Sequence, residues 1–251
     1  MSIQSLRSSL ITVAITGIIF MLQIQLSITG NVGQKNINQT NICNKKQVDK
    51  CAISLVPLTD PELLQRPPKT LADLDHWCRK FKRSEKCVRQ YSDQCLVSES
   101  RRTLSIVLYS ISKTLRRYCG QTKRKQELLN LSHCLGNDLT NVSEVLFELS
   151  GDMHAIRSIE PANMRIPLCC CGYQRRKEVM INLLEHKCST FVEMMETMLQ
   201  GFTGDLFNYV CGDYNEDSDK CQYIIDKIKP WTKPLEWKSF ILPVVQIVES
   251  L

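Results

Sequence analysis

Cysteine and histidine are the residues of this chain with the most specific chemistry. The 251 residues include 13 cysteines and four histidines, and such side chains can bind zinc, act as a catalytic thiol pair or form disulfides. No Cys-x2-Cys pair occurs at zinc-finger spacing. The histidines are not paired four residues apart either; they are His76, His133, His154 and His186. The sequence therefore predicts no metal site and no cofactor.

Two histidines lie close to cysteines, a pattern that can indicate thiol catalysis. His133 precedes Cys134, and His186 lies two residues before Cys188. An oxidising compartment would convert such thiols to disulfides. The chain also lacks a Gly-x-Ser-x-Gly elbow, a phosphate-binding glycine-rich loop and a His-Glu-x-x-His motif. We therefore predict that the protein is not an enzyme, with a secreted hydrolase as the third alternative.

The first 30 residues have the composition of a secretory signal peptide. Their one charged side chain is Arg7, an apolar run extends from Leu10 to Leu22, and small residues follow up to Gly30. A membrane span needs about 20 apolar residues, and no stretch of the chain reaches this length. We expect a secreted, extracellular protein with no membrane span. Three sequons predict a glycoprotein modified at Asn38, Asn130 and Asn141.

Thirteen cysteines in a secreted chain predict a disulfide framework. The odd count leaves at least one thiol unpaired in a monomer, or available to link two chains into a dimer. Each bridge that closes a loop of about 15 residues contributes about 3 kcal/mol in the loop-entropy description. The spacing alone leaves the connectivity open. The disulfide candidates are Cys43, Cys51, Cys78, Cys87, Cys95, Cys119, Cys134, Cys170, Cys171, Cys188, Cys211 and Cys221.

Two long stretches bounded by cysteines have the apolar period of an amphipathic helix. The first runs from Cys95 to Cys119 and the second from Cys188 to Cys211. The apolar residues are Leu104, Val107, Leu108, Ile111, Leu115 and Tyr118 in the first stretch, and Phe191, Met195, Met198, Phe202 and Leu206 in the second. The ends of such a helix would lie roughly 36 Å apart at about 1.5 Å per residue, whereas a disulfide needs Cα atoms within about 7 Å. Neither stretch should therefore be bridged end to end.

Strand-like alternation is absent, so the sequence predicts an all-α, disulfide-stapled helical bundle. The expected parts are a signal peptide (1–30), a loose lead-in with a proline-rich connector (31–69), and two helical halves (70–160 and 161–251) in one continuous globular domain. A break is expected near Ser84, and a last helix from about Leu235 to Ser250. Cysteines at 78, 95, 119 and 134 recur about 93 residues later at 171, 188, 211 and 221. This recurrence indicates two degenerate helical repeats, with coincidence as the alternative.

Charge and methionine content bear on the class of ligand. The net charge of +6 is too mild for a nucleic-acid binder. Basic clusters could hold a sulfated polysaccharide or an acidic lipid surface if several shared one face; otherwise they form an ordinary solvated surface. They lie at 79–83, 101–102, 116–117, 123–125 and 175–177. Met180, Met194, Met195 and Met198 suit either an apolar ligand cavity or an ordinary core.

Several cysteines and aromatic residues carry a resemblance to a known family. They are Trp77-Cys78 with Phe81, Cys87 with Tyr91, Cys95-Leu96, and Cys170-Cys171 with Tyr173. In this spacing, roughly from Cys43 to Cys221, the chain resembles the arthropod secreted cysteine-rich proteins grouped with the insect haemolymph glycoproteins. The resemblance implies a secreted, helical protein and carries over no catalytic residue. The adjacent cysteine pair of that family matches Cys170 and Cys171, so Cys169 is the departure from its pattern and our candidate free thiol.

The sequence thus favours a secreted, non-enzymatic binding protein of haemolymph or of a secretion such as venom or saliva. The first version of this hypothesis is a carrier of a small apolar ligand. The alternative is an effector that binds an extracellular protein or glycan.

Overall fold

The structure is a computed structural model, and it describes residues 43–216 and 218–251. Residues 45–251 form one compact unit. The described residues contain helices and turns and no strand, which confirms the all-α prediction. The predicted signal peptide and Asn38 lie outside the described residues.

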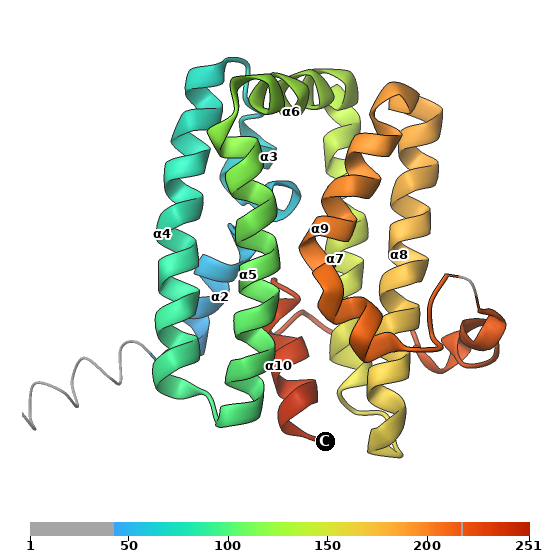
Figure 1. Cartoon of the computed structure of the whole chain (residues 1–251). Helices are drawn as coiled ribbons and strands as arrows, with labels where there is room; N and C mark the ends of the chain where they lie inside the picture. Colours follow the sequence, from blue (N-terminus) through green and yellow to red (C-terminus); the bar gives the residue numbers. More distant parts are fainter. Residues whose placement is uncertain (1–42, 217) are drawn as a thin grey trace, which may run out of the picture. The chain divides into compact units, whose positions relative to one another are not determined.

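Long helices make up most of the compact unit. In Figure 1, α4, α5, α9, α7 and α8 stand alongside one another, and α6 crosses one end of this row. Helix α10 packs against α5 and α7. The helices are α2 (Lys45–Ile53), α3 (Pro61–Gln65), α4 (Leu71–Cys95), α5 (Ser98–Gly120), α6 (Thr122–Leu135), α7 (Leu139–Ile156), α8 (Arg165–Cys188), α9 (Val192–Cys211) and α10 (Ile241–Glu249).

Two helical hairpins, α4–α5 and α8–α9, have matching disulfides. Cys78 of α4 bonds to Cys119 of α5, and Cys170 of α8 bonds to Cys211 of α9. Both bridges join residues 41 positions apart. These two bridges align Cys170, rather than the predicted Cys171, with Cys78, at an offset of 92 residues where about 93 was predicted.

Three further bridges link the hairpins to other elements. Cys51 of α2 bonds to Cys87, Cys134 of α6 to Cys188, and Cys171 to Cys221. Cys134 is bonded to Cys188 at the end of α8, whereas Cys221 is bonded to Cys171 near the start of the same helix. The predicted equivalence of Cys134 and Cys221 is therefore wrong. Two further candidates, Cys43 and Cys95, are also in disulfide form.

The long helices begin later than the cysteine spacing predicted. Cys95 is the last residue of α4 and Cys188 the last residue of α8, whereas α5 begins at Ser98 and α9 at Val192. The predicted break near Ser84 is also wrong. Helix α4 is continuous because residues 71–95 contain no glycine or proline, the two residues that most often interrupt a helix.

The segment that follows α2, which includes the start of the predicted proline-rich connector, is buried. Residues 52–60 are all buried. Prolines at 57 and 61 limit this segment to short helices, but its apolar side chains Leu55, Val56 and Leu58 belong to the main core. The Thr59 hydroxyl donates hydrogen bonds to the carbonyls of Ile53 and Val56.

The C-terminal region also differs from the prediction. Helix α10 starts at Ile241, because the preceding backbone is held by other partners. The amides of Lys238 and Ser239 donate to the Asp49 carboxylate at 2.9 and 3.0 Å. The Ser150 hydroxyl donates to the carbonyls of Trp237 and Ser239.

Candidate ligand site

A buried aspartate organises one side of the site. Asp60 is fully buried and is the N-cap of α3, where its Oδ1 accepts the backbone N–H groups of Glu62 and Leu63 at 2.9 and 3.3 Å. Pro61 occupies the first helical position, where a missing N–H costs nothing. The same Oδ1 accepts a hydrogen bond from Lys80 Nζ at 2.8 Å. The Asp60-Pro61 sequence thus starts α3, and the Asp60 carboxylate contacts α4 through Lys80.

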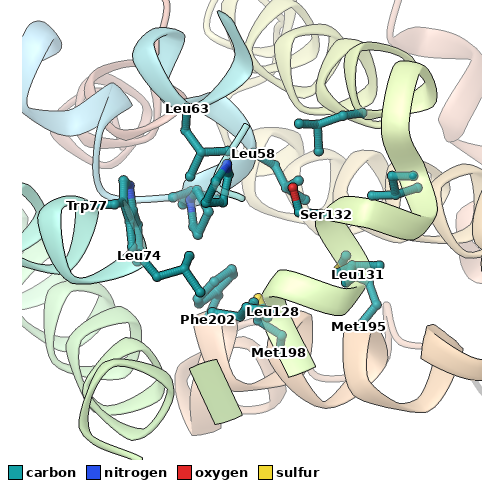
Figure 2. A pocket seen from close by; sticks show the side chains of 15 residues that line it. Leu58, Leu63, Leu74, Trp77, Leu128, Leu131, Ser132, Met195, Met198 and Phe202 are labelled. Atoms are coloured by element: carbon teal, nitrogen blue, oxygen red, sulfur yellow. The ribbon is translucent and has the colours of Figure 1, made fainter. Parts of the chain in front are cut away.

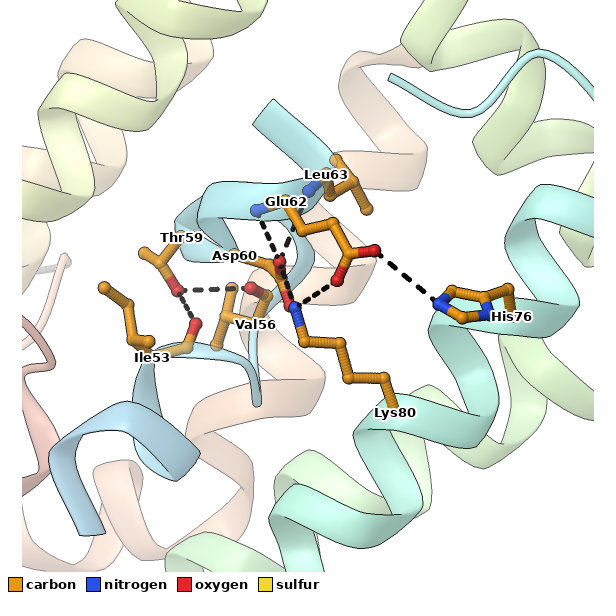
Figure 3. Close-up of polar contacts among 8 residues, drawn as sticks. All are labelled: Ile53, Val56, Thr59, Asp60, Glu62, Leu63, His76 and Lys80. Carbon is orange, nitrogen blue, oxygen red and sulfur yellow. Dashed lines mark hydrogen bonds and ion pairs between the residues drawn. The ribbon is translucent and has the colours of Figure 1, made fainter. Parts of the chain in front are cut away.

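Two side chains of α4, one turn apart, complete this polar cluster (Figure 3). Lys80 Nζ also contacts Glu62 Oε2 at 2.9 Å, and His76 Nε2 lies 3.6 Å from Glu62 Oε1. Burial would lower the pKa of Lys80, but Asp60 and Glu62 raise that pKa above its ordinary value. The hydrogen bond from Lys80 lowers the pKa of Glu62. Lys80 and Glu62 are therefore charged at neutral pH, and their contact links α3 to α4.

A polar cleft of about 510 Å³ opens beside this cluster. Its volume falls within the range of about 300–1,000 Å³ that is usual for small-molecule sites. Acidic and basic side chains both line it, so it presents hydrogen-bond acceptors and donors. The lining residues are Asp60, Glu62, Gln65, Arg66, Pro67, Pro68, Lys69, Asp73, His76, Trp77 and Lys80.

A small apolar cavity of about 40 Å³ adjoins the cleft. Figure 2 shows its lining side chains converging from several helices, with Trp77 on one side and Ser132 on the other. Trp77 and Pro68 line both the cavity and the cleft. The cavity lining is Val56, Pro57, Leu58, Leu63, Pro68, Leu74, Trp77, Leu128, Leu131, Ser132, Leu135, Leu139, Met195, Met198 and Phe202.

Two polar groups in the cavity lining lack a hydrogen-bond partner among the described residues. They are the indole Nε1–H of Trp77 and the hydroxyl of Ser132. Their residues are only 5% and 9% exposed. A buried donor without a partner costs about 1–3 kcal/mol. A ligand that carries a hydrogen-bond acceptor could offset this cost at either group.

The four methionines singled out in the sequence divide between the two alternatives given for them, an apolar cavity and the core. Met195 and Met198 line the cavity, whereas Met180 is buried and Met194 partly buried in the core. Trp77 entered the sequence argument only through a family resemblance, and Asp60 lay within the predicted proline-rich connector. The Asp-Pro pair was a usable signal for an N-cap, but no sequence signal indicated that Lys80 would reach it.

The histidines and cysteines are arranged for structure. Cys134 and Cys188 are bonded to each other, so the neighbouring histidines have no thiol to activate. His154 is fully buried; its Nδ1 lies 2.7 Å from the Ser150 carbonyl and its Nε2 accepts the amide N–H of Trp237. Within the described part of the chain, no group of histidine, cysteine and acidic side chains could hold a metal ion.

Cys169 is the one free thiol among the described cysteines. It is partly buried, and burial raises the pKa of its thiol to about 12. Asn130 and Asn141, the two candidate glycosylation sites in the described region, are exposed on α6 and α7. The structure thus places both asparagines where a glycan could be attached without entering the core.

Comparisons with known proteins give no relative. No protein-family model, curated protein or solved structure matches the chain. No helix of the described residues is long and apolar enough to cross a membrane.

Proposed function

We propose that this protein is a secreted, non-enzymatic carrier of a small, mainly apolar ligand that has one polar end. The observation that carries the proposal is the junction at Trp77 and Pro68, where the polar cleft meets the apolar cavity. An amphiphile would place its polar end among the charged side chains of the cleft. Its apolar end would enter the cavity between α4, α6 and α9.

The cavity would have to widen for such a ligand, and its lining supports this. About 40 Å³ accommodates little more than one or two water molecules. Met195, Met198 and Phe202 form its α9 side, and methionine side chains change shape at low cost because they are unbranched and flexible. Rotation of these side chains would extend the cavity toward α9 while the polar cluster on α3 and α4 stays in place.

The disulfides support the extracellular part of the proposal, because such bonds are typical of oxidising compartments. The apolar run near the N-terminus and the resemblance to haemolymph glycoproteins support secretion into haemolymph or a secretion such as venom or saliva. Fully bridged cysteines at 134 and 188 support a binding role over thiol chemistry.

The test is a binding assay on the intact secreted protein with a fluorescent naphthylamine probe and straight-chain aliphatic alcohols and carboxylates as competitors. We expect saturable probe binding that the competitors displace. Met198→Ala should enlarge the cavity and shift the preference toward longer chains. Native mass spectrometry of the protein from its source should show a copurified amphiphile of matching size.

Met180→Ala is the matched control. Met180 is as buried as Met198 but does not line the cavity, so both variants lose the same side-chain volume at a cost of about 2–5 kcal/mol. Added ligand should stabilise Met198→Ala more than Met180→Ala. Absence of probe binding, or an equal change of chain-length preference in both variants, would refute the proposed site.

A further inference from the structure

The basic residues of this protein are concentrated in one hairpin. Residues 71–120, which form α4 and α5, contain eleven basic and five acidic residues, a net charge of +6 that equals the charge of the whole chain. Residues 165–211, which form α8 and α9, contain five of each and have no net charge. From 79 to 89 and from 101 to 117, Glu85 is the one acidic residue.

An ion-pair cluster places the basic residues of the two helices on a common face. Glu85 Oε1 lies 3.0 Å from Arg89 of the same helix and 3.0 Å from Arg116 of α5. The Glu85 side chain is 11% exposed, whereas those of Arg89 and Arg116 are 43% and 63% exposed. The two arginines therefore share one carboxylate at the seam between α4 and α5 and leave an excess of positive charge.

Helical periodicity extends this cluster into two rows. Residues 82, 86 and 89 of α4 follow the spacing of one helix face, as do residues 102, 113, 116 and 117 of α5. The two helices are antiparallel and face each other at the Glu85–Arg116 contact. Side chains that are rotated from this contact in the same direction, viewed along each helix from its N-terminus, therefore project on the same side of the hairpin. We call this set the basic face: Lys82, Lys86, Arg89, Arg102, Lys113, Arg116 and Arg117.

Most of the basic face is free to bind an anion. Lys82, Lys86, Arg102, Lys113 and Arg117 are exposed, and none of them makes an ion pair with another described residue. The row on α5 extends roughly 22 Å from residue 102 to residue 117 at about 1.5 Å per residue. Tyr109, which lies within this row, is 62% exposed.

We propose that the basic face binds a sulfated polysaccharide. Six cations gather around the Glu85–Arg116 contact, and Arg102 lies roughly 16 Å further along α5 at about 1.5 Å per residue. This arrangement suits a polyanion that spans both, and the planar guanidinium groups of arginine suit the oxygens of a sulfate group. The exposed ring of Tyr109 offers an apolar surface for a sugar ring. Lys80 points instead to Asp60 and Glu62, so the basic face and the ligand cleft lie on different sides of α4, and the proposal is independent of the carrier function.

The test measures binding of the intact secreted protein to heparin at 0.15 M NaCl by calorimetry. We expect saturable binding that weakens as salt is raised, because salt screens exposed charges. The double variant Lys113→Gln/Arg117→Gln should bind roughly tenfold more weakly, since two exposed charge contacts are lost. Both residues are exposed on α5, and circular dichroism will verify that the fold is unchanged.

The control Lys227→Gln/Lys229→Gln removes the same net charge from exposed positions off the hairpin, and its affinity should stay within about twofold of wild type. Equal losses in the two double variants would show attraction by total charge and overturn the proposal. No binding to heparin at 0.15 M NaCl would also overturn it. Binding to vesicles that contain phosphatidylserine, without binding to heparin, would assign the face to a membrane surface instead.

Discussion

The α4–α5 and α8–α9 hairpins have the same covalent frame and different surroundings. In each, a disulfide joins residues 41 positions apart, from near the start of the first helix to the end of the second. A second cysteine of each first helix is bonded outside the hairpin, Cys87 to Cys51 and Cys171 to Cys221. The shared disulfides indicate that these bonds set how the two helices of each hairpin pair. The residues on the surface of each hairpin set its charge and its contacts.

The two hairpins differ in their helix ends and in their surfaces. Helix α4 begins with a capping box formed by Thr70 and Asp73, whereas α8 begins without a side-chain cap. Helix α9 is kinked at Gly204, where φ is 58°, and Met195 and Met198 of this helix line the apolar cavity. The first hairpin carries the basic face. The same covalent frame therefore supports a charged surface in the first hairpin only, while both hairpins contribute to the apolar cavity, α4 through Leu74 and Trp77 and α9 through Met195 and Met198.

The largest expected effect comes from removing the matched bridges. Replacing Cys78 and Cys119 with serine, or Cys170 and Cys211, should each lower the free energy of unfolding by about 4 kcal/mol, because the closed loops have equal length. Urea unfolding of the two secreted variants measures both values. A difference of more than about 2 kcal/mol would show that the bridges are not equivalent and that loop entropy does not account for them.

The contact between the hairpins should be the next most sensitive feature. A Cβ at Gly201 of α9 would lie 2.4 Å from Thr114 Oγ1 of α5. Gly201→Ala should therefore cost about 1–3 kcal/mol through overpacking, measured by thermal unfolding. Gly120→Ala is the control in the first hairpin, because a Cβ added at that position would have no neighbouring atom within 4 Å.

Thr114→Ala provides the second half of this test. In the Thr114→Ala background, the added methyl group at position 201 would no longer meet the threonine side chain, and its cost should fall by more than half. If the cost is unchanged, the close approach of α5 and α9 does not explain it.

Removal of the side-chain cap of α4 should have a smaller effect. Helix α8 has no side-chain cap to remove. Thr70→Ala should lower stability by about 1 kcal/mol, whereas Thr70→Ser keeps the hydroxyl that accepts the Asp73 amide. Backbone hydrogen bonds, first from Lys69, lower the pKa of Asp73 in the folded protein. The stability that the Asp73 carboxylate contributes is therefore present above its unfolded pKa and is lost as pH falls through its lowered folded pKa.

Acid titration of stability tests the cap. Asp73→Asn should flatten the dependence of unfolding free energy on pH below the ordinary carboxyl range, while Thr70→Ser should retain it. An unaltered dependence in Asp73→Asn would assign the acid sensitivity to other carboxylates.

The smallest expected effect is at the free thiol of the second hairpin. Cys169→Ser should lower stability by less than about 1 kcal/mol, because it exchanges a partly buried thiol for a hydroxyl of similar size. The variant should secrete as a monomer, because Cys169 has no bridge to lose. Cys170→Ser or Cys171→Ser should each leave one cysteine without its disulfide partner. Each should lower the free energy of unfolding by several kcal/mol, as expected for the loss of a native bridge. Non-reducing gels give the readout, and a wild-type dimer that Cys169→Ser abolishes would assign Cys169 to a link between chains.

The sequence by itself determined the helical class, the positions of α5 and α9 to within a few residues and the exclusion of end-to-end bridges across them. These properties depend on neighbours along the chain: the apolar period of α5, for example, places Leu104, Leu108 and Leu115 in the core. The same local information led to the break expected at Ser84 and to the connector expected around Leu55. Tertiary packing decided the second case, because the core buries this segment, whereas α4 is continuous because its own residues 71–95 contain no glycine or proline.

Only the tertiary structure decided the disulfide partners, the cavity and the common basic face. Cys134 and Cys188 are 54 positions apart, and spacing cannot show that their Cα atoms meet. The junction at Trp77 joins a turn near Pro57 to methionines of α9, and the basic face requires the seam set by Glu85 and Arg116. Each depends on contacts between elements far apart in the chain, and these contacts form because the whole core packs together.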